Sequence, residues 1–188
     1  FGNDVPGKLG KDFNITAGTY FKKLSVKYMG NAMYNDAITY RPNSQARFPQ
    51  PVWRFTNQLQ LAYNFSSDTK LNMTVRNAYD YIKKELAVAN NGVISNSYGR
   101  EINNDWNINT SLSHRFNSKV NSTLRLYSTI FDGSEKLSFK EKPDSIYYDG
   151  FRQRFYRAEN QTDISFKKMN LTVGAGYIID EARSTRYD

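Results

Sequence analysis

The chain has 188 residues, a formal net charge of +8, no Cys and a single His. The absence of Cys excludes a disulfide framework and a thiolate metal site. No stretch approaches the roughly 18 consecutive apolar residues of a membrane-spanning helix, and the mean hydropathy is -0.71. The positive charge fits either a basic channel or anionic partners such as a lipid, a metal chelate or a nucleic acid.

Apolar and polar residues alternate most clearly in the segment 59–77. Leu59, Leu61 and Tyr63 occupy every second position before a polar Ser-Ser-Asp-Thr turn, and the alternation resumes at Leu71. A period of two places successive side chains on opposite faces of a β-strand. Two such runs around a short polar turn predict an antiparallel hairpin with one apolar and one polar face.

The same unit recurs along the chain. An aromatic residue precedes each short turn, at Phe21, Phe65, Phe116 and Phe166, with a spacing of roughly 45–50 residues that marks an internal repeat. Four hairpins predict eight strands, which we place at about residues 13–21, 24–34, 52–65, 70–83, 105–116, 120–131, 151–167 and 170–181.

The segments between the hairpins are longer and less regular than the turns within them. We expect loops at residues 1–12, 35–51, 84–104 and 132–150. For the segment 84–104 the alternative is a hairpin of its own, with its turn at Asn90-Asn91-Gly92. Short turns at one end and long loops at the other are typical of outer-membrane β-barrels. Several predicted strands also exceed the usual five or six residues of a soluble protein and reach the roughly 9–11 residues that cross a bilayer.

Aromatic residues gather near both ends of the predicted strands. Near the short turns these are Phe21, Phe65, Phe116 and Phe166, and near the long loops they are Tyr34, Trp53, Phe55, Tyr79, Tyr81, Trp106 and Phe155. Two aromatic girdles around an aliphatic band are what the two membrane interfaces favour. Ordinary β-propensity, which also enriches aromatic residues in strands, is the alternative explanation.

This pattern, and most of all the segment Phe155–Asp188 (FYRAENQTDISFKKMNLTVGAGYIIDEARSTRYD), resembles the barrel of TonB-dependent outer-membrane receptors of the kind found in the Bacteroidetes. The resemblance implies an all-β, antiparallel transmembrane barrel of 22 strands, of which residues 1–188 would supply about eight. It also implies an N-terminal plug domain, which this sequence lacks, so we expect an interior part of the barrel.

The resemblance further implies location in the cell outer membrane and uptake of a scarce nutrient, for which a ferric siderophore or a similar metal chelate is our first expectation. A TonB-type energy-coupling protein would act through the plug, and lipopolysaccharide and a surface lipoprotein are further expected partners. Arginine and aromatic residues in the outer loops suit an anionic, partly apolar ligand. The candidate ligand-binding residues are Arg41, Arg47, Trp53, Arg54, Tyr98, Arg100, Tyr147, Tyr148, Arg152 and Arg154, and the candidate lumen-lining residues are Arg76 and Arg125. These loop residues could equally be solvated or contact lipopolysaccharide phosphates.

No catalytic constellation is visible, so we expect neither an enzyme nor a bound cofactor or metal. His114 is the only His, and it lies an even number of positions from Trp106 and Leu112, hence on the same face of the predicted strand. This favours a position at the membrane interface over a role as a base or a ligand. Two other readings stay open: a small eight-stranded outer-membrane barrel acting as an adhesin or anchor, and a soluble β-sandwich binding module. Only the net charge favours a nucleic-acid binder. Because the basic residues are dispersed over strands and loops, we expect no nucleic-acid partner.

Overall fold

The computed structural model describes residues 10–35, 51–90, 93–139 and 146–185, with side chains left undescribed at 85–90, 93–96, 139 and 146. This part of the chain contains eight β-strands and no helix, and so no helix that is long and apolar enough to cross a membrane. The strands are β1 (Lys11–Phe21), β2 (Leu24–Asn35), β3 (Val52–Asn64), β4 (Thr69–Asn90), β5 (Val93–Arg115), β6 (Val120–Phe139), β7 (Ile146–Ser165) and β8 (Asn170–Ser184).

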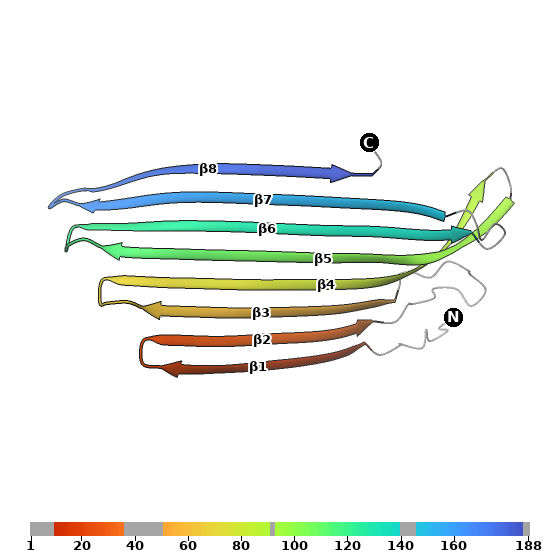
Figure 1. The fold of residues 1–188 in the computed structure, drawn as a ribbon, viewed down its shortest axis with the longest axis horizontal. Helices are drawn as coiled ribbons and strands as arrows, with labels where there is room; N and C mark the ends of the chain where they lie inside the picture. The colour runs from red at the N-terminus through yellow and green to blue at the C-terminus, as the bar shows by residue number, and fades with distance from the viewer. Residues whose placement is uncertain (1–9, 36–50, 91–92, 140–145, 186–188) are drawn as a thin grey trace, which may run out of the picture.

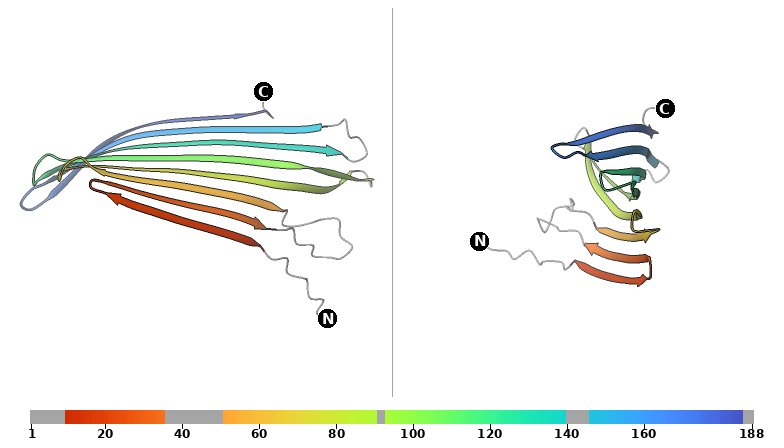
Figure 2. Two further views of the ribbon diagram at one scale, coloured as in Figure 1. Left: turned by 60° about the horizontal axis from the view of Figure 1, so that its bottom comes forward. Right: turned by 90° about the vertical axis from the view of Figure 1, so that its left-hand side faces the viewer.

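The eight strands form one sheet in which each strand pairs antiparallel with its neighbours in sequence, in the order β1 to β8 (Figure 1). The prediction of an all-β, antiparallel fold with four hairpins is therefore confirmed. The sheet is open, with β1 and β8 at its two edges. It forms a single curved layer, with no second layer of described residues against either face (Figure 2).

Two of the predicted loops are largely strand. The ladder between β4 and β5 continues without a break to the pair Asn90–Val93, so the expected loop at 84–104 is wrong and its alternative, a hairpin, is correct. β6 and β7 likewise extend into the segment predicted as a loop at 132–150. Both extensions lack sustained apolar alternation, yet contain no Pro to interrupt the ladder. The loop predicted at 35–51 lies almost wholly outside the described residues. Residues 1–9 of the loop predicted at 1–12 also lie outside them, and β1 already begins at Lys11.

The short turns close as the repeat predicts. The amide of Phe65 donates to the carbonyl oxygen of Thr69 at 3.0 Å, and that of Phe116 donates to Val120 at 3.0 Å. In the β3–β4 turn, the Ser66 hydroxyl accepts the amides of the two residues that follow Ser67, each at 3.1 Å. Polar side chains that satisfy the turn backbone in this way explain why Ser and Asn occupy these positions.

The β1–β2 turn contains a strained residue, Lys22, whose φ is 50°. This left-handed region costs a residue with a Cβ about 1–2 kcal/mol, whereas Gly adopts it freely. We therefore expect Lys22→Gly to be more stable than Lys22→Ala by about 1 kcal/mol, since both variants lose the charge and only one keeps the Cβ. Denaturant titration of the two variants measures the difference, and an alanine variant as stable as the glycine variant would contradict a strained turn.

Residues directly opposite one another on neighbouring strands project from the same face of a sheet. The register therefore assigns every strand residue to one of two faces. The apolar face includes Trp53, Ile108 and Leu126, together with the residues paired to them on neighbouring strands. The polar face includes the residues that precede or follow these in the chain, such as Arg54 and Asn109.

Successive hairpins are staggered in one direction. Following the register from the pair Phe21–Leu24, which closes the first hairpin, leads strand by strand to Asn160 on β7. The fourth hairpin closes at the pair Ser165–Asn170, five residues further along β7 than Asn160. The short turns accordingly step outward from β1–β2 to β7–β8 (Figure 1), as they do when strands incline to the axis of a closing sheet.

Candidate functional site

The polar face carries ion pairs that link neighbouring strands near the end opposite the short turns. Arg54 on β3 donates from Nε and Nη2 to the two carboxylate oxygens of Asp80 on β4, each at 2.7 Å. Lys84 lies between two carboxylates, with Nζ 2.5 Å from Glu101 on β5 and 3.0 Å from Glu135 on β6. The bidentate geometry strengthens the Arg54–Asp80 pair, and partial burial strengthens the pairs of Lys84 relative to solvent-exposed ones.

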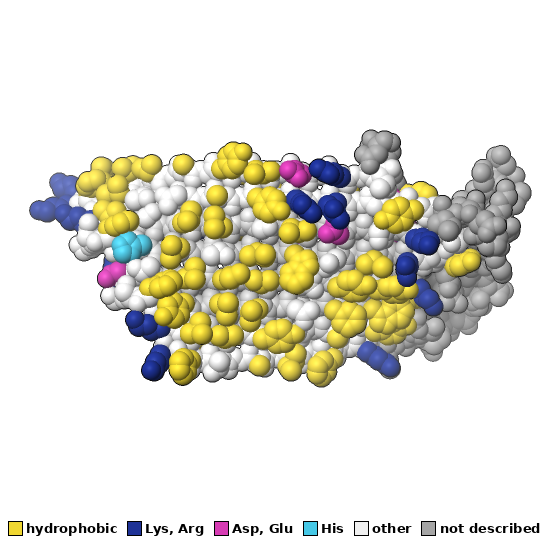
Figure 3. Space-filling model, in the orientation of Figure 1, with side chains coloured by type: hydrophobic (Ala, Val, Ile, Leu, Met, Phe, Trp, Pro, Cys, Tyr) yellow, Lys and Arg dark blue, Asp and Glu magenta, His cyan; other side chains and the backbone are white. Residues whose placement is uncertain are grey.

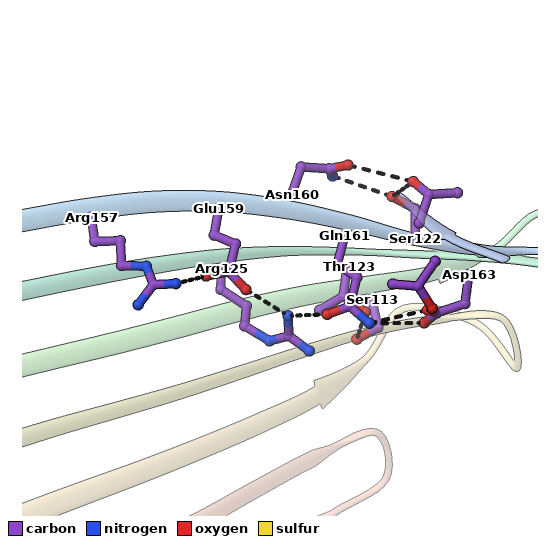
Figure 4. Close-up of polar contacts among 11 residues, drawn as sticks. Ser113, Ser122, Thr123, Arg125, Arg157, Glu159, Asn160, Gln161 and Asp163 are labelled. Atoms are coloured by element: carbon purple, nitrogen blue, oxygen red, sulfur yellow. Dashed lines mark hydrogen bonds and ion pairs between the residues drawn. The ribbon is translucent and has the colours of Figure 1, made fainter. Parts of the chain in front are cut away.

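A second polar cluster lies nearer the short turns, on β6 and β7 (Figure 4). Nη1 of Arg125 donates to Glu159 and to the amide oxygen of Gln161, each at 3.1 Å. Glu159 also accepts from Arg157 on its own strand. One carboxylate, 22% exposed, thus serves two guanidinium groups.

The cluster continues to the edge strand through Asp163. The Gln161 amide donates to its carboxylate at 3.0 Å, and the Thr172 hydroxyl on β8 donates to it at 2.7 Å. Each member therefore meets a partner of complementary character, and the described residues contain no buried side-chain nitrogen or oxygen without a hydrogen bond. A satisfied network of this kind makes a rigid, hydrophilic surface.

Charge is distributed unequally between the two faces. On the polar face, cations and anions nearly balance: Lys27, Arg54, Lys70, Arg76, Lys84, Arg115, Arg125 and Arg157 against Asp12, Asp80, Glu101, Asp105, Glu135, Asp149, Glu159, Asp163 and Asp180. On the apolar face, among the residues whose side chains are described, cations predominate: Lys11, Lys83, Arg100, Lys136, Arg152, Arg154 and Arg183 against Asp132 and Glu181. The positive charge of the described strands thus belongs to the apolar face rather than to the polar one.

The apolar face has aromatic groups towards both ends of the strands (Figure 3). At one end, the ring of Trp53 contacts Tyr34 and Tyr81, with centroid distances of 4.8 and 5.4 Å. At the other end, His114 packs edge-on against Phe116, with 4.5 Å between centroids, and its Nδ1 lies 2.8 Å from the Thr69 hydroxyl. Aliphatic residues such as Leu61, Val75, Ile108, Leu126 and Ile179 lie on this face between these groups.

One titratable group in the short turns has a displaced pKa. Arg115 donates to the Asp68 carboxylate from Nε at 2.8 Å and from Nη2 at 2.5 Å. These hydrogen bonds, with a further one from Ser67, hold the pKa of Asp68 below its ordinary value. The carboxylate consequently stays ionised and bridges the β3–β4 turn to β5 at neutral pH.

The structure divides the described candidate residues between the two faces of the sheet. Six of them lie on the apolar face and two of the ligand-binding candidates on the polar face, because successive strand residues point to opposite sides. On the apolar face are Trp53, Tyr98, Arg100, Tyr148, Arg152 and Arg154; on the polar face are Arg54 and Tyr147, with both lumen-lining candidates, Arg76 and Arg125; and Arg41 and Arg47 lie outside the described residues. Arg54 is already neutralised by Asp80, and Arg152 donates to Asp132 at 2.5 Å.

Sequence reasoning missed the acidic members of the polar clusters. Glu101 and Glu135 could not be recognised from the sequence, because both fell in predicted loops and Glu135 meets Lys84 across the intervening strand. The signal for Asp80 was present, because the tight β3–β4 turn fixes the register that sets it opposite Arg54.

No protein-family model matches this chain, and a search of curated proteins likewise finds no match. The likeness to TonB-dependent receptors therefore remains a prediction from the sequence pattern. Within the described ranges, no group of three or more His, Asp or Glu side chains is arranged to hold a metal ion. The geometry itself provides two chemically opposite surfaces on one sheet: a hydrogen-bonding face suited to water and polar solutes, and an apolar face bounded by aromatic rings.

Proposed function

We propose that this chain forms part of the wall of a transmembrane β-barrel in the cell outer membrane and belongs to a TonB-dependent receptor that imports a scarce nutrient. The observation that carries the proposal is the division of the sheet into two faces. A barrel wall requires an apolar outer band with aromatic residues at both interfaces and a polar inner surface, and the register of the eight strands is compatible with both.

Two further features support a barrel wall over a β-sandwich. The described residues form a single layer, so no second sheet covers Ile108, Leu126 and the other aliphatic residues of the apolar face. A sandwich would bury that face against a second sheet about 10 Å away. The one-directional stagger of the hairpins matches the shear that closure of a barrel demands.

The substrate part of the proposal rests on the resemblance. A ferric siderophore is an anionic, partly apolar solute, and the expected TonB-type protein would energise its passage through the plug domain that the resemblance implies. The ion pairs of the polar face neutralise most of its charge within the sheet, so we expect the wall to offer hydrogen bonds to a passing solute and to leave tight binding to the loops and plug.

Electrophoresis of the native protein, extracted from outer membranes in detergent and run with and without boiling, tests the barrel. A heat-modifiable band several times the 21.8 kDa of this chain is the expected result for a 22-stranded receptor. A heat-modifiable band near 21.8 kDa would favour the small eight-stranded barrel. A protein soluble without detergent would overturn the membrane proposal altogether.

Growth under iron limitation tests the transport. A strain lacking the protein should lose growth on at least one supplied ferric siderophore, and disruption of the TonB-type protein should cause the same loss. Unchanged growth on a broad panel of siderophores, by a strain whose receptor is otherwise heat-modifiable, would reject the substrate class and keep the barrel.

A further inference from the structure

Four aromatic side chains follow one another along the polar face, on β6 and β7. The register places them in successive rows of this face, two positions apart along the strands, and they come alternately from β7 and β6. Counted from the end opposite the short turns, they are Phe151, Phe131, Phe155 and Tyr127, which we call the aromatic track. Successive rows lie roughly 7 Å apart, because a strand rises about 3.3 Å per residue.

The aromatic residues of the polar face are confined to a small part of the sheet. Among the residues whose side chains are described, the only others on this face are Tyr147, also on β7, and Tyr20 on the edge strand β1. The sequence pattern grouped Phe155 with an aromatic girdle, but the register places it on the polar face. β-Propensity alone would distribute aromatic residues over all the strands, so it does not explain the track.

The rings of the track are accessible on a face that is otherwise polar. Phe151 is 40% exposed, and the other three side chains are partly buried. The rings of Phe131 and Phe151 lie 5.9 Å apart between centroids, and the guanidinium of Arg157 lies 5.9 Å from the centre of the Tyr127 ring. Apolar groups gathered on a polar surface indicate a contact with a ligand or a partner.

Hydrogen-bonding groups flank the track on both sides. On β5, Asn107 donates to Asp105 at 2.9 Å and accepts from the Thr129 hydroxyl at 2.9 Å. On the other side, Gln153 donates to Asp180 on β8 at 3.3 Å. A carboxylate has two acceptor oxygens and an amide two donor hydrogens, so one contact within the wall exhausts neither group. Aromatic rings in the middle are thus combined with donors and acceptors at the edges.

The charge beside the track disfavours an anionic solute. Asp105 and Asp180 lie directly opposite track residues on the neighbouring strands. Arg157 donates to the carboxylate of Glu159 (Figure 4), and Arg76 on β4 is separated from the track by β5. An anion lying on the rings would therefore meet a carboxylate at each edge.

We propose that the aromatic track binds a neutral oligosaccharide that passes along the polar face. A pyranose ring presents C–H groups on its face and hydroxyl groups around its edge. The negative face of an aromatic ring attracts the polarised C–H groups, and the hydroxyl groups can donate to the flanking carboxylates and accept from the flanking amides. A wholly apolar solute would leave these edge groups unused. The inference rests on the proposed function, which makes the polar face the solute path, and it names a solute class other than the metal chelate.

The test measures binding of three neutral probes, maltohexaose, cellohexaose and xylohexaose, to the full-length protein in detergent by saturation-transfer NMR. The variant Phe131→Leu/Phe155→Leu keeps the apolar bulk but removes two ring faces, and it should weaken binding of the best probe by about 10-fold or more. The matched control, Phe13→Leu/Phe55→Leu, removes two exposed rings from the apolar face and should change the affinity less than about twofold.

Two further variants separate ring stacking from a general loss of structure. Phe131→Tyr/Phe155→Tyr keeps both ring faces and should bind within about threefold of the wild type. Asn107→Ala keeps all four rings and should weaken binding by about fivefold, because a flanking amide is lost. Absence of binding by all three saccharides, equal losses in the Leu variant and the control, or tighter binding of the aromatic anion 2,3-dihydroxybenzoate at the track would overturn the inference.

The outcomes also distinguish this inference from the proposed function. A heat-modifiable outer-membrane protein that binds none of the three saccharides would reject the track as a saccharide site and leave the barrel intact. Saccharide binding that depends on the track, in a protein soluble without detergent, would reject the barrel and keep the track as the site of a binding module.

Discussion

Replacing Ile108 with Arg should lower the free energy of unfolding in a lipid bilayer by about 2–4 kcal/mol, the cost of a basic residue at the midplane of a barrel wall. Ile108 lies on the apolar face of the central strand β5, between Trp106 and Leu112. In the proposed barrel wall, a charge there would face hydrocarbon without a counter-ion. Guanidinium titration of the protein in phospholipid vesicles, followed by Trp fluorescence, measures the effect.

The control is the next residue in the chain. Asn109 is exposed on the polar face, and Asn109→Arg should change the free energy of unfolding by no more than about 0.5 kcal/mol. His114→Arg tests depth on the apolar face, because an arginine near the interface costs only about 0–1 kcal/mol. Equal costs for Ile108→Arg and Asn109→Arg would refute the assignment of faces, and a cost at position 114 equal to that at 108 would argue for a protein core in place of a bilayer.

Replacing Glu159 with Ala should cost about 1–3 kcal/mol of stability, since it leaves the partly buried Arg125 and the more exposed Arg157 without their shared carboxylate. The loss reflects uncompensated positive charge more than the strength of either pair. Denaturant titration measures it, with Asp180→Ala as the control: Asp180 is an exposed carboxylate on the same face with one long contact, to Gln153 at 3.3 Å.

A double-mutant cycle identifies the cause. Arg125→Met combined with Glu159→Ala should cost less than the two single changes added together, because the pair is then removed as a unit. Additive costs would show that Arg125 and Glu159 are energetically independent despite their 3.1 Å contact. A loss in Asp180→Ala as large as in Glu159→Ala would point instead to the net charge of the face.

The hairpins were predictable because their information is local. Alternation over a few residues, a tight polar turn and the preceding Phe define a hairpin without reference to the rest of the chain. The extensions of β4 and β5 were not predictable in this way. Polar stretches such as Ser95–Arg100 show no apolar face, and only pairing with the neighbouring strand identifies them as strand.

The candidate site was harder to predict because it depends on which residues face each other. The alternation of side chains along a strand could have placed Arg152 and Arg154 on the same face as Tyr156. This is the apolar face, away from a polar solute path. The pairing of Lys84 with Glu135 lay beyond such reasoning. Predicting this pair requires the register of β4 with β5 and that of β5 with β6. The first of these ladders ends in a turn after the Asn90–Val93 pair, in a segment predicted as a loop.

The strictly sequential order of the sheet also bears on how the protein folds. Every ladder joins strands that are adjacent in the chain, so no strand must wait for a distant partner. Each hairpin can form within about 1–10 μs and then offer its edge to the next. The loops that must close are only those between neighbours in sequence, of which the longest joins Asn35 to Val52. The sheet can therefore grow by successive addition of hairpins, with each tight turn setting the alignment of its own two strands.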